Sequence, residues 1–568
     1  MTATPFHAVD VPFHAGVPFH VYDTTLRDGA QQEGMNLSVT DKLAIAAQLD
    51  ELGVGFIEGG WPGAVPKDTD FFARAAKELT LRNAVLAAFG ATRKAGLRAG
   101  NDPQVRALLD AGTPVVTLVA KSDVRHVERA LRTTREENLA MISDTVSFLA
   151  GEGRRVVLDA EHFFDGYRYD AAYALSAIRA AHDAGAEVLC LCDTNGGMIP
   201  SWVSGIVSEV VEALGGSAVV GRTGDDGRPA GPVIGMHAHN DSGCAVANTL
   251  AAVEAGATHI QGCVNGYGER TGNADLIAVT ANLQLKLGMD LVGEHGLREA
   301  TRIAHAISEV TNISPFARQP YVGQSAFTHK AGLHASAIRV DPDLYQHMDP
   351  KDVGNDMRML VSDMAGRASV ELKGRELGFD LSDRKDVLAA VTDRVKHDEA
   401  RGYTYEAADA SFELVLRDEL GELPRYFETQ SWRTIVETVP DGHTPADVYG
   451  PEAEAFAEAT VKMTVGAERI VATGEGNGPV DALDRAVRQA LTPVYPELER
   501  FELIDFKVRI LDNEQGTDAR TRVLVETSDG ERSWSTVGVG PNVIEAAWEA
   551  TTGAYVYGLI KAGVAPAR

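Results

Sequence analysis

The chain has 568 residues, of which 44% are hydrophobic and 24% charged, a balance typical of a globular protein with more than one domain. Its net charge of −28 argues against nucleic acid or an anionic membrane as a partner, because neither attracts an acidic surface. No apolar run approaches the ~20 residues of a membrane span, and no signal peptide is visible. Only four cysteines occur, without the spacing of a disulfide framework, so we expect a cytoplasmic protein.

After an N-terminal segment of 18 residues, which we expect to be a loose tail, short apolar runs alternate with helix-like stretches. Eight runs precede residue 290, and each has the length of a buried strand. They lie at 19–26, 54–60, 83–90, 114–121, 155–164, 188–194, 233–239 and 259–266. This alternation predicts an α/β fold, a (β/α)₈ TIM barrel over 19–290, with its active site at the carboxyl ends of the strands. An open doubly wound sheet is the alternative, but no GxGxxG follows the first strand.

Polar residues follow the predicted strands. They are Arg27, Asp28 and Gln31 after the first, Glu58 on the second, Asp159 and Glu161 on the fifth, Thr194 after the sixth, His237, His239 and Asn240 at the seventh, and Asn273 after the eighth. His237 and His239 are two positions apart, so their side chains share one face of a strand. Such a pair alone also fits two ordinary buried histidines. A carboxylate beside them would complete a site for Mg²⁺, Mn²⁺ or Zn²⁺.

Two cysteines, Cys190 and Cys192, lie in the sixth apolar run, VLCLCD. We expect them to be strand residues packed in the core, because a structural zinc site needs four ligands. A glycine-rich stretch at 215–232 breaks the strand-helix rhythm just before the seventh run. We expect it to be an inserted surface loop.

Four motifs, TTLRDGAQQ, the glutamate of LDAEH, HAHND and GYGERTGN, together resemble the 2-isopropylmalate synthase / homocitrate synthase family of TIM-barrel metalloenzymes and the related 3-hydroxy-3-methylglutaryl-CoA lyases. The resemblance implies a divalent metal ion and acetyl-CoA as co-substrate. The implied metal ligands are Asp28, His237 and His239, with Asn273 as a further ligand or near neighbour. It also implies that Arg27 and Thr194 bind a 2-oxo acid within reach of Gln31, and that Glu161 is the base. Glu58, Asn240 and Gln31 could instead only orient the residues that do so.

The rest of the chain resembles the C-terminal half of these synthases. We expect helical linker subdomains over 291–425, a connector over 426–455 and a C-terminal α+β regulatory domain with an internal repeat over 456–568. The resemblance implies a homodimer and a feedback ligand, isoleucine or leucine. It also suggests His329 and Tyr345 as a catalytic pair on the CoA side, with His334 as an alternative to His329.

Within the family, the stretches IEGGWPGAVPKDTDFF, FGATRKAG and DAEHFFDGY look like the citramalate branch. That branch uses pyruvate as its 2-oxo acid and serves isoleucine biosynthesis. A 2-isopropylmalate synthase using 2-oxoisovalerate is the first alternative. A lyase, in which Cys263 would be catalytic, and a non-catalytic amino-acid sensor are less favoured, since the chain keeps the polar set and continues well past the barrel.

Overall fold

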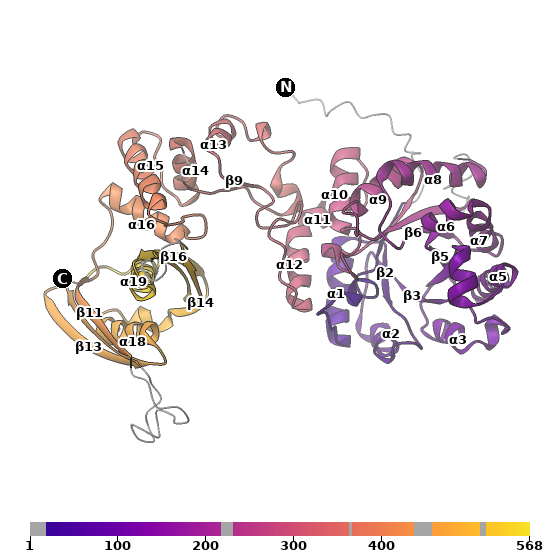
Figure 1. Cartoon of the computed structure of the whole chain (residues 1–568), viewed down its shortest axis with the longest axis horizontal. Coiled ribbons are helices and arrows are strands. Elements are labelled where there is room, and N and C mark those ends of the chain that lie inside the picture. Colours follow the sequence, from indigo (N-terminus) through magenta and orange to yellow (C-terminus); the bar gives the residue numbers. More distant parts are fainter. Residues whose placement is uncertain (1–18, 217–230, 363–365, 437–456, 512–518, 568) are drawn as a thin grey trace, which may run out of the picture. The chain divides into compact units, whose positions relative to one another are not determined.

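A computed structural model describes residues 19–216, 231–362, 366–436, 457–511 and 519–567 (Figure 1). The chain divides into two compact units. The first ends at Phe327 and includes 348–356, and the second comprises 328–347 and the chain from Met357 onward. The expected N-terminal tail and most of the 215–232 insertion lie outside the described residues.

Eight parallel strands close into a barrel in chain order, which confirms the (β/α)₈ prediction (Figure 1). They are β1 (His20–Asp23), β2 (Phe56–Gly60), β3 (Val85–Ala91), β4 (Val115–Lys121), β5 (Arg155–Glu161), β6 (Val188–Asp193), β7 (Val233–Ala238) and β8 (His259–Gly262). Closure is visible at Tyr22, which pairs with Phe56 on β2 and with Gln261 on β8. The fifth strand is shorter than predicted, because Phe163 and Phe164 begin a helix.

Helices cover the outside of the barrel. They are α1 (Val39–Leu52), α2 (Pro66–Glu78), α3 (Pro103–Asp110), α4 (Val124–His126), α5 (Arg135–Gly151), α6 (Phe163–Tyr169), α7 (Ala171–Asp183), α8 (Pro200–Ala213), α9 (Ala245–Glu254) and α10 (Leu276–Leu287). Helix α1 shows how local sequence sets their ends. The Ser38 hydroxyl accepts a hydrogen bond from the Asp41 amide in a capping box, and Gly53 ends the helix at φ 93°. No helix among the described residues is both long and apolar enough to cross a bilayer.

The first unit extends beyond the predicted barrel boundary at 290. Helices α11 (Gly293–Arg298) and α12 (Ala300–Thr311) pack onto the barrel, and Arg302 of α12 forms an ion pair with Glu51 of α1. Helix α11 lies close to the end of α1: a Cβ on Gly296 of α11 would lie 2.1 Å from the Leu52 carbonyl oxygen. The segment after residue 290 therefore begins as part of the barrel unit rather than as a separate linker.

The second unit begins with short elements and three longer helices. They are β9 (Thr328–His329), α13 (Gly332–Ile338), β10 (Arg358–Met359), α14 (Arg367–Glu376), α15 (Lys385–Ala400) and α16 (Asp409–Leu420). Val391 and Val395 of α15 and Phe412 of α16 belong to a shared apolar core. The helical character predicted for this region is thus present.

The C-terminal part contains two copies of a strand-strand-strand-helix unit. The first is β11 (Glu428–Val436), β12 (Ala457–Val465), β13 (Glu468–Gly476) and α18 (Pro479–Leu491). The second is β14 (Glu502–Ile510), β15 (Thr521–Ser528), β16 (Ser533–Gly540) and α19 (Val543–Lys561). The repeat copies agree in detail: each first strand has a register irregularity near its start, at Thr429/Ser431 and at Leu503/Asp505.

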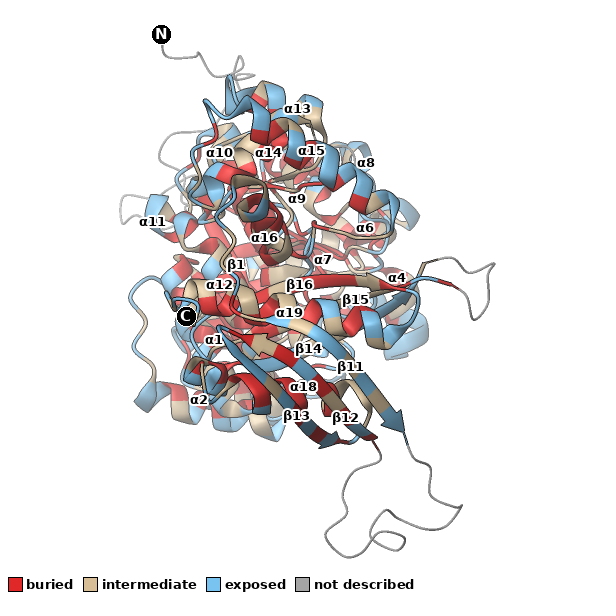
Figure 2. Cartoon of the chain, turned by 90° about the vertical axis from the view of Figure 1, so that its left-hand side faces the viewer, coloured by how far each residue is buried: buried red, intermediate tan, exposed pale blue. Residues whose placement is uncertain are grey.

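One sequence expectation in this region was wrong. Residues 428–436, assigned to the 426–455 connector, form strand β11, which pairs with β12. The stretch FELIDFKVRIL contains β14, the first strand of the second copy, which pairs with β15. Strand β11 is largely exposed, as Figure 2 shows in pale blue and tan. It therefore lacks the clear alternation of polar and apolar residues by which a half-buried strand is identified.

Candidate metal centre and active site

A cavity of about 760 Å³ lies in the barrel, at the carboxyl ends of its strands, where a (β/α)₈ fold places its active site. Its wall gathers most of the predicted site residues. They are Arg27, Asp28, Gln31, Glu161, Thr194, His237 and His239. Asn273 is buried and donates a hydrogen bond to Asp28, 2.9 Å between Nδ2 and Oδ2. Seven side chains from four strand ends thus face one space, with Asn273 joined to them through Asp28.

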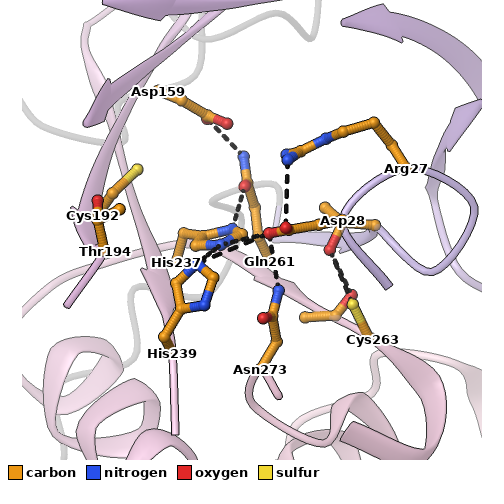
Figure 3. Close-up of polar contacts among 12 residues, drawn as sticks. Arg27, Asp28, Asp159, Cys192, Thr194, His237, His239, Gln261, Cys263 and Asn273 are labelled. Atoms are coloured by element: carbon orange, nitrogen blue, oxygen red, sulfur yellow. Dashed lines mark hydrogen bonds and ion pairs between the residues drawn. The ribbon is translucent and has the colours of Figure 1, made fainter. Parts of the chain in front are cut away.

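The three expected metal ligands converge on one point. Oδ2 of Asp28 lies 3.0 Å from Nε2 of His237 and 3.8 Å from Nε2 of His239, and the two Nε2 atoms are 3.3 Å apart (Figure 3). Atoms with lone pairs that face one another so closely repel unless a cation or a proton lies between them. A carboxylate with two imidazoles suits Mg²⁺, Mn²⁺ or Zn²⁺.

The side-chain amide of Asn273 lies beside these three residues. Its Oδ1 is buried without a hydrogen-bond partner, while its Nδ2 faces Asp28. A flip of the amide would turn Oδ1 toward the same point, since the oxygen and nitrogen of an amide occupy nearly equivalent positions. The donor set therefore fits a divalent cation.

The charge of Asp28 is maintained by its neighbours. Burial alone would raise its pKa, but the Arg27 guanidinium and His237 hold the pKa well below its ordinary value. Asp28 is thus a carboxylate, the protonation state that a metal ligand requires.

Arg27 is held in place from two sides. Its Nε donates to Oε1 of Glu58 at 2.6 Å, and its guanidinium lies 3.8 Å above the centre of the Phe89 ring. Glu58 is itself fixed, because its Oε2 accepts a hydrogen bond from the Tyr22 hydroxyl at 2.7 Å. Glu58 therefore orients Arg27, in line with the orienting role considered for it from the sequence.

Three other predicted residues lie around the cavity. Glu161 forms an ion pair with Lys121. The Thr194 hydroxyl accepts a hydrogen bond from the amide of His162 at 2.8 Å, so its proton is available for an acceptor in the cavity. Gln31 ends a short 3₁₀ turn and is exposed at the cavity wall. Asn240, in contrast, uses its side-chain oxygen to accept a hydrogen bond from the Ala245 amide at the start of α9.

His329 and Tyr345 belong to the second unit, where each ring packs against His334. The Tyr345 ring stacks on His334 with centroids 4.1 Å apart, and His334 in turn lies edge-on to His329 at 5.9 Å. Burial lowers the pKa of His329, and its Nε2 has no hydrogen-bond partner. All three side chains thus form one cluster, and His334 is its centre.

Cys263 would be the catalytic cysteine if the chain were a lyase. It is fully buried, with its sulfur 3.2 Å from Oγ1 of Thr24. Burial raises the pKa of its thiol well above the ordinary value, which disfavours the reactive thiolate.

Gln261 is a site residue that the sequence did not reveal. Its Oε1 is 2.8 Å from Nδ1 of His237, and its Nε2 donates to Oδ1 of Asp159 at 2.8 Å (Figure 3). Burial, reinforced by the Glu58 carboxylate, raises the pKa of Asp159 to about 7. The available indication was positional: Gln261 shares the barrel-facing side of β8 with His259. Its contact with His237 could not be inferred from that.

A closed barrel that gathers two imidazoles, a carboxylate and a fixed arginine at its catalytic face defines an enzyme of the metal-dependent TIM-barrel class. The profile of the HMGL-like family matches residues 19–305, that of the homocitrate synthase post-HMGL domain matches 321–402, and that of the LeuA allosteric (dimerisation) domain matches 406–559. The chain belongs to the HMGL-like family, in the group of the 2-isopropylmalate and homocitrate synthases.

Two relatives resemble it over almost their whole length. The (R)-citramalate synthase of Streptomyces coelicolor is 60% identical, over 97% of this chain and 98% of the relative. The (R)-citramalate synthase of Synechocystis is 47% identical, over 95% and 96%. Among solved structures, the hydroxymethylglutaryl-CoA lyase of Pseudomonas aeruginosa is 21% identical, over 53% of this chain and 96% of that chain, with a TM-score of 0.42.

Proposed function

We propose that this chain is an (R)-citramalate synthase, which condenses acetyl-CoA with pyruvate and hydrolyses the thioester to give citramalate and CoA. The observation that carries the proposal is the convergence of Asp28, His237 and His239 beside the fixed Arg27. Five relatives named (R)-citramalate synthase are 41–60% identical over at least 93% of this chain, and their names support pyruvate and acetyl-CoA as the substrates.

Substrate binding is assigned to residues of the cavity. Arg27 holds the 2-oxo acid by its carboxylate, because a guanidinium matches a carboxylate with two parallel hydrogen bonds. The Thr194 hydroxyl donates its proton in a hydrogen bond to the same carboxylate. The cation, Mg²⁺ or Mn²⁺, would be held by Asp28, His237, His239 and Asn273, and when bound it supplies the Lewis acidity that polarises a ketone.

The condensation needs a base and a group that stabilises negative charge. Glu161, which forms an ion pair with Lys121, takes a proton from the methyl group of acetyl-CoA. The resulting enolate carbon attacks the ketone carbon of pyruvate. Arg27 then stabilises the charge that develops on the ketone oxygen, and hydrolysis of the thioester makes the reaction irreversible.

The cluster of His329, His334 and Tyr345 is proposed to act on the CoA side of the reaction. Their contacts with one another support a joint role. His334→Ala and His329→Ala distinguish which histidine acts with Tyr345. A loss of kcat in His334→Ala as large as that in His329→Ala supports His334 as the partner of Tyr345.

The test of the reaction is acetyl-CoA-dependent thiol release. Pyruvate, 2-oxoisovalerate, 2-oxobutyrate and 2-oxoglutarate are offered separately with Mg²⁺ or Mn²⁺, and pyruvate is expected to give the highest kcat/KM. A preference for 2-oxoisovalerate would instead assign the chain to 2-isopropylmalate synthesis. Lack of thiol release with all four acids would contradict a synthase altogether.

Regulation and assembly are proposed from the C-terminal domain. The match to the LeuA allosteric (dimerisation) domain supports a homodimer that binds isoleucine or leucine as a feedback ligand. Light scattering gives the assembly state, and thiol release with each amino acid gives the inhibition. A monomer at assay concentrations would contradict the homodimer. Equal rates of thiol release with and without each amino acid would contradict feedback inhibition.

A further inference from the structure

A second group of metal-ligating side chains lies in the barrel, away from the Asp28 centre. Asp159 of β5 and Cys190 of β6 are paired across the two strands, and Cys192 shares a face of β6 with Cys190. One carboxylate oxygen and the two sulfurs all lie within 4.8 Å of one another, and all three residues are buried. Figure 3 shows Cys192 with its sulfur on the Asp159 side of the strand.

The group differs from the Asp28 centre in chemistry. Two sulfurs and one oxygen prefer thiophilic ions such as Zn²⁺ and Cd²⁺, whereas Mg²⁺ and Mn²⁺ prefer oxygen ligands. Asp159 and Cys192 line the catalytic cavity, so an ion can reach them from solvent. The open side toward the cavity leaves room for water as a fourth ligand. The sequence alone offered two ligands, and the fold adds the third.

We propose that Asp159, Cys190 and Cys192 form a second cation site, which takes a thiophilic divalent ion and thereby inhibits the enzyme. Binding breaks two S–H bonds, forms two metal–sulfur bonds and one metal–oxygen bond, and releases the two thiol protons to solvent. Burial raises the pKa of both thiols, so in the absence of an ion the site holds thiols and carries little charge.

Inhibition follows from the hydrogen bond between Asp159 and Gln261. Oδ1 of Asp159 accepts from Gln261 Nε2, and Gln261 Oε1 contacts Nδ1 of His237. An ion on Asp159 competes for that carboxylate and disturbs the glutamine that orients His237. Excess Mg²⁺ does not relieve this inhibition, because Mg²⁺ does not compete for a sulfur site.

Binding is tested first, on the reduced full-length protein preloaded with Mg²⁺ and titrated with CdCl₂. Wild type is expected to develop one equivalent of sulfur-to-cadmium charge-transfer absorbance, which Cys190→Ser and Cys192→Ser lose. Cys244→Ser is the matched control, since Cys244 is half-buried at the start of α9 outside this group. Wild-type absorbance that survives both Cys190→Ser and Cys192→Ser, or no absorbance in wild type, would overturn the site. This experiment does not depend on the proposed reaction.

Inhibition is tested by thiol release with Mg²⁺ in large excess. The Cd²⁺ concentration for half inhibition is expected to rise at least tenfold in Cys190→Ser and Cys192→Ser, each compared with its own Cd²⁺-free rate, and to stay unchanged in Cys244→Ser. Asp159→Asn, which keeps an acceptor for Gln261, should weaken inhibition as well. If Cd²⁺ acts at the Asp28 centre instead, the cysteine variants stay sensitive and Mg²⁺ restores activity. Circular dichroism establishes that each variant is folded.

Discussion

Oε1 of Gln261 lies 2.8 Å from Nδ1 of His237, so a residue of strand β8 fixes the orientation of the His237 ring on strand β7. An imidazole that donates from Nδ1 presents the lone pair of Nε2, the atom that faces Asp28. Because Gln261 Nε2 is bound to Asp159, the glutamine cannot turn without losing that bond.

Gln261→Leu should therefore weaken metal binding by about 10- to 100-fold. The volume is nearly preserved, while the hydrogen bonds of the Gln261 side chain to His237, Asp159 and His259 are lost. Isothermal titration with Mn²⁺ measures the affinity, and saturating Mn²⁺ should recover a large part of kcat. A purely structural role would instead lower the melting temperature while leaving the Mn²⁺ affinity unchanged.

His237→Ala should remove most of the metal affinity and reduce kcat at least ~100-fold, more than loss of a residue that only orients a ligand. The fold should remain, because His237 lines the cavity and is not part of the apolar core of the barrel. Mass spectrometry of the metal content checks the loss of metal binding, and circular dichroism checks that the fold is retained. Full activity of the variant after chelation and dialysis would end the metal interpretation.

Arg27→Lys should raise KM for pyruvate and lower kcat/KM by about 100-fold, because an ammonium cannot reproduce the paired bonds of a guanidinium to a carboxylate. The substitution also loses the bond from Arg27 Nε to Glu58 and the contact above Phe89. Arg74→Lys is the control, since Arg74 binds Glu78 and Thr40 at the surface and does not line the cavity. Equal kinetics for the two variants would remove Arg27 from the site.

Acid should destabilise the barrel through buried histidines. Burial, aided by Arg155, lowers the pKa of His20 from 6.5 to about 4, against the opposing charge of Glu187. Above pH 6.5 His20 is neutral both folded and unfolded. As pH falls from 6.5 toward 4, only the unfolded chain takes up the proton, so stability is lost, by roughly 3 kcal/mol at most.

His20→Gln cannot take up that proton, so its stability should fall less steeply between pH 7 and pH 4. Thermal unfolding of chelator-treated wild type and variant at several pH values gives the comparison. His259, with its Nδ1 3.4 Å from Nδ1 of His20 and its pKa also lowered by burial, remains in both proteins. Parallel curves would show that His20 does not contribute.

Gly538→Ala should destabilise the C-terminal domain by about 1–3 kcal/mol. A Cβ at this position of β16 would lie 2.1 Å from the Ala546 carbonyl oxygen of α19. Gly474, its counterpart in the first copy, has a Cβ position 2.4 Å from the Ala486 amide. These glycines therefore allow a helix to approach its sheet closely, rather than marking only turns.

Gly553→Ala is the matched control for that prediction. Its Cβ would meet only Leu414 and Thr536, at 3.8 and 3.9 Å, and Gly553 lies within helix α19. Alanine there should leave stability unchanged or raise it by about 0.5–1 kcal/mol. Thermal unfolding of both variants decides the matter, and an equal loss in both would contradict the packing argument.

The sequence by itself determined the barrel, the order of its strands and most of the polar residues that line its cavity. Buried parallel strands are short apolar runs, and polar residues such as Arg27, Asp28, His237 and His239 interrupt that pattern where the strands end. These features are local, so a single sequence displays them. The expected repeat of the C-terminal domain was recognisable for the same reason, from its strands and its glycines.

Only the tertiary structure decided which of these residues touch. Gln261 and Asp159 are 102 positions apart and are joined by one hydrogen bond, and Asp159 and Cys190 meet because β5 and β6 pair in a particular register. The sequence also did not predict strand β11, because it is exposed on much of its length. It is identified only by its pairing with β12. Contacts of this kind depend on how distant segments pack, and no local pattern of hydrophobicity encodes them.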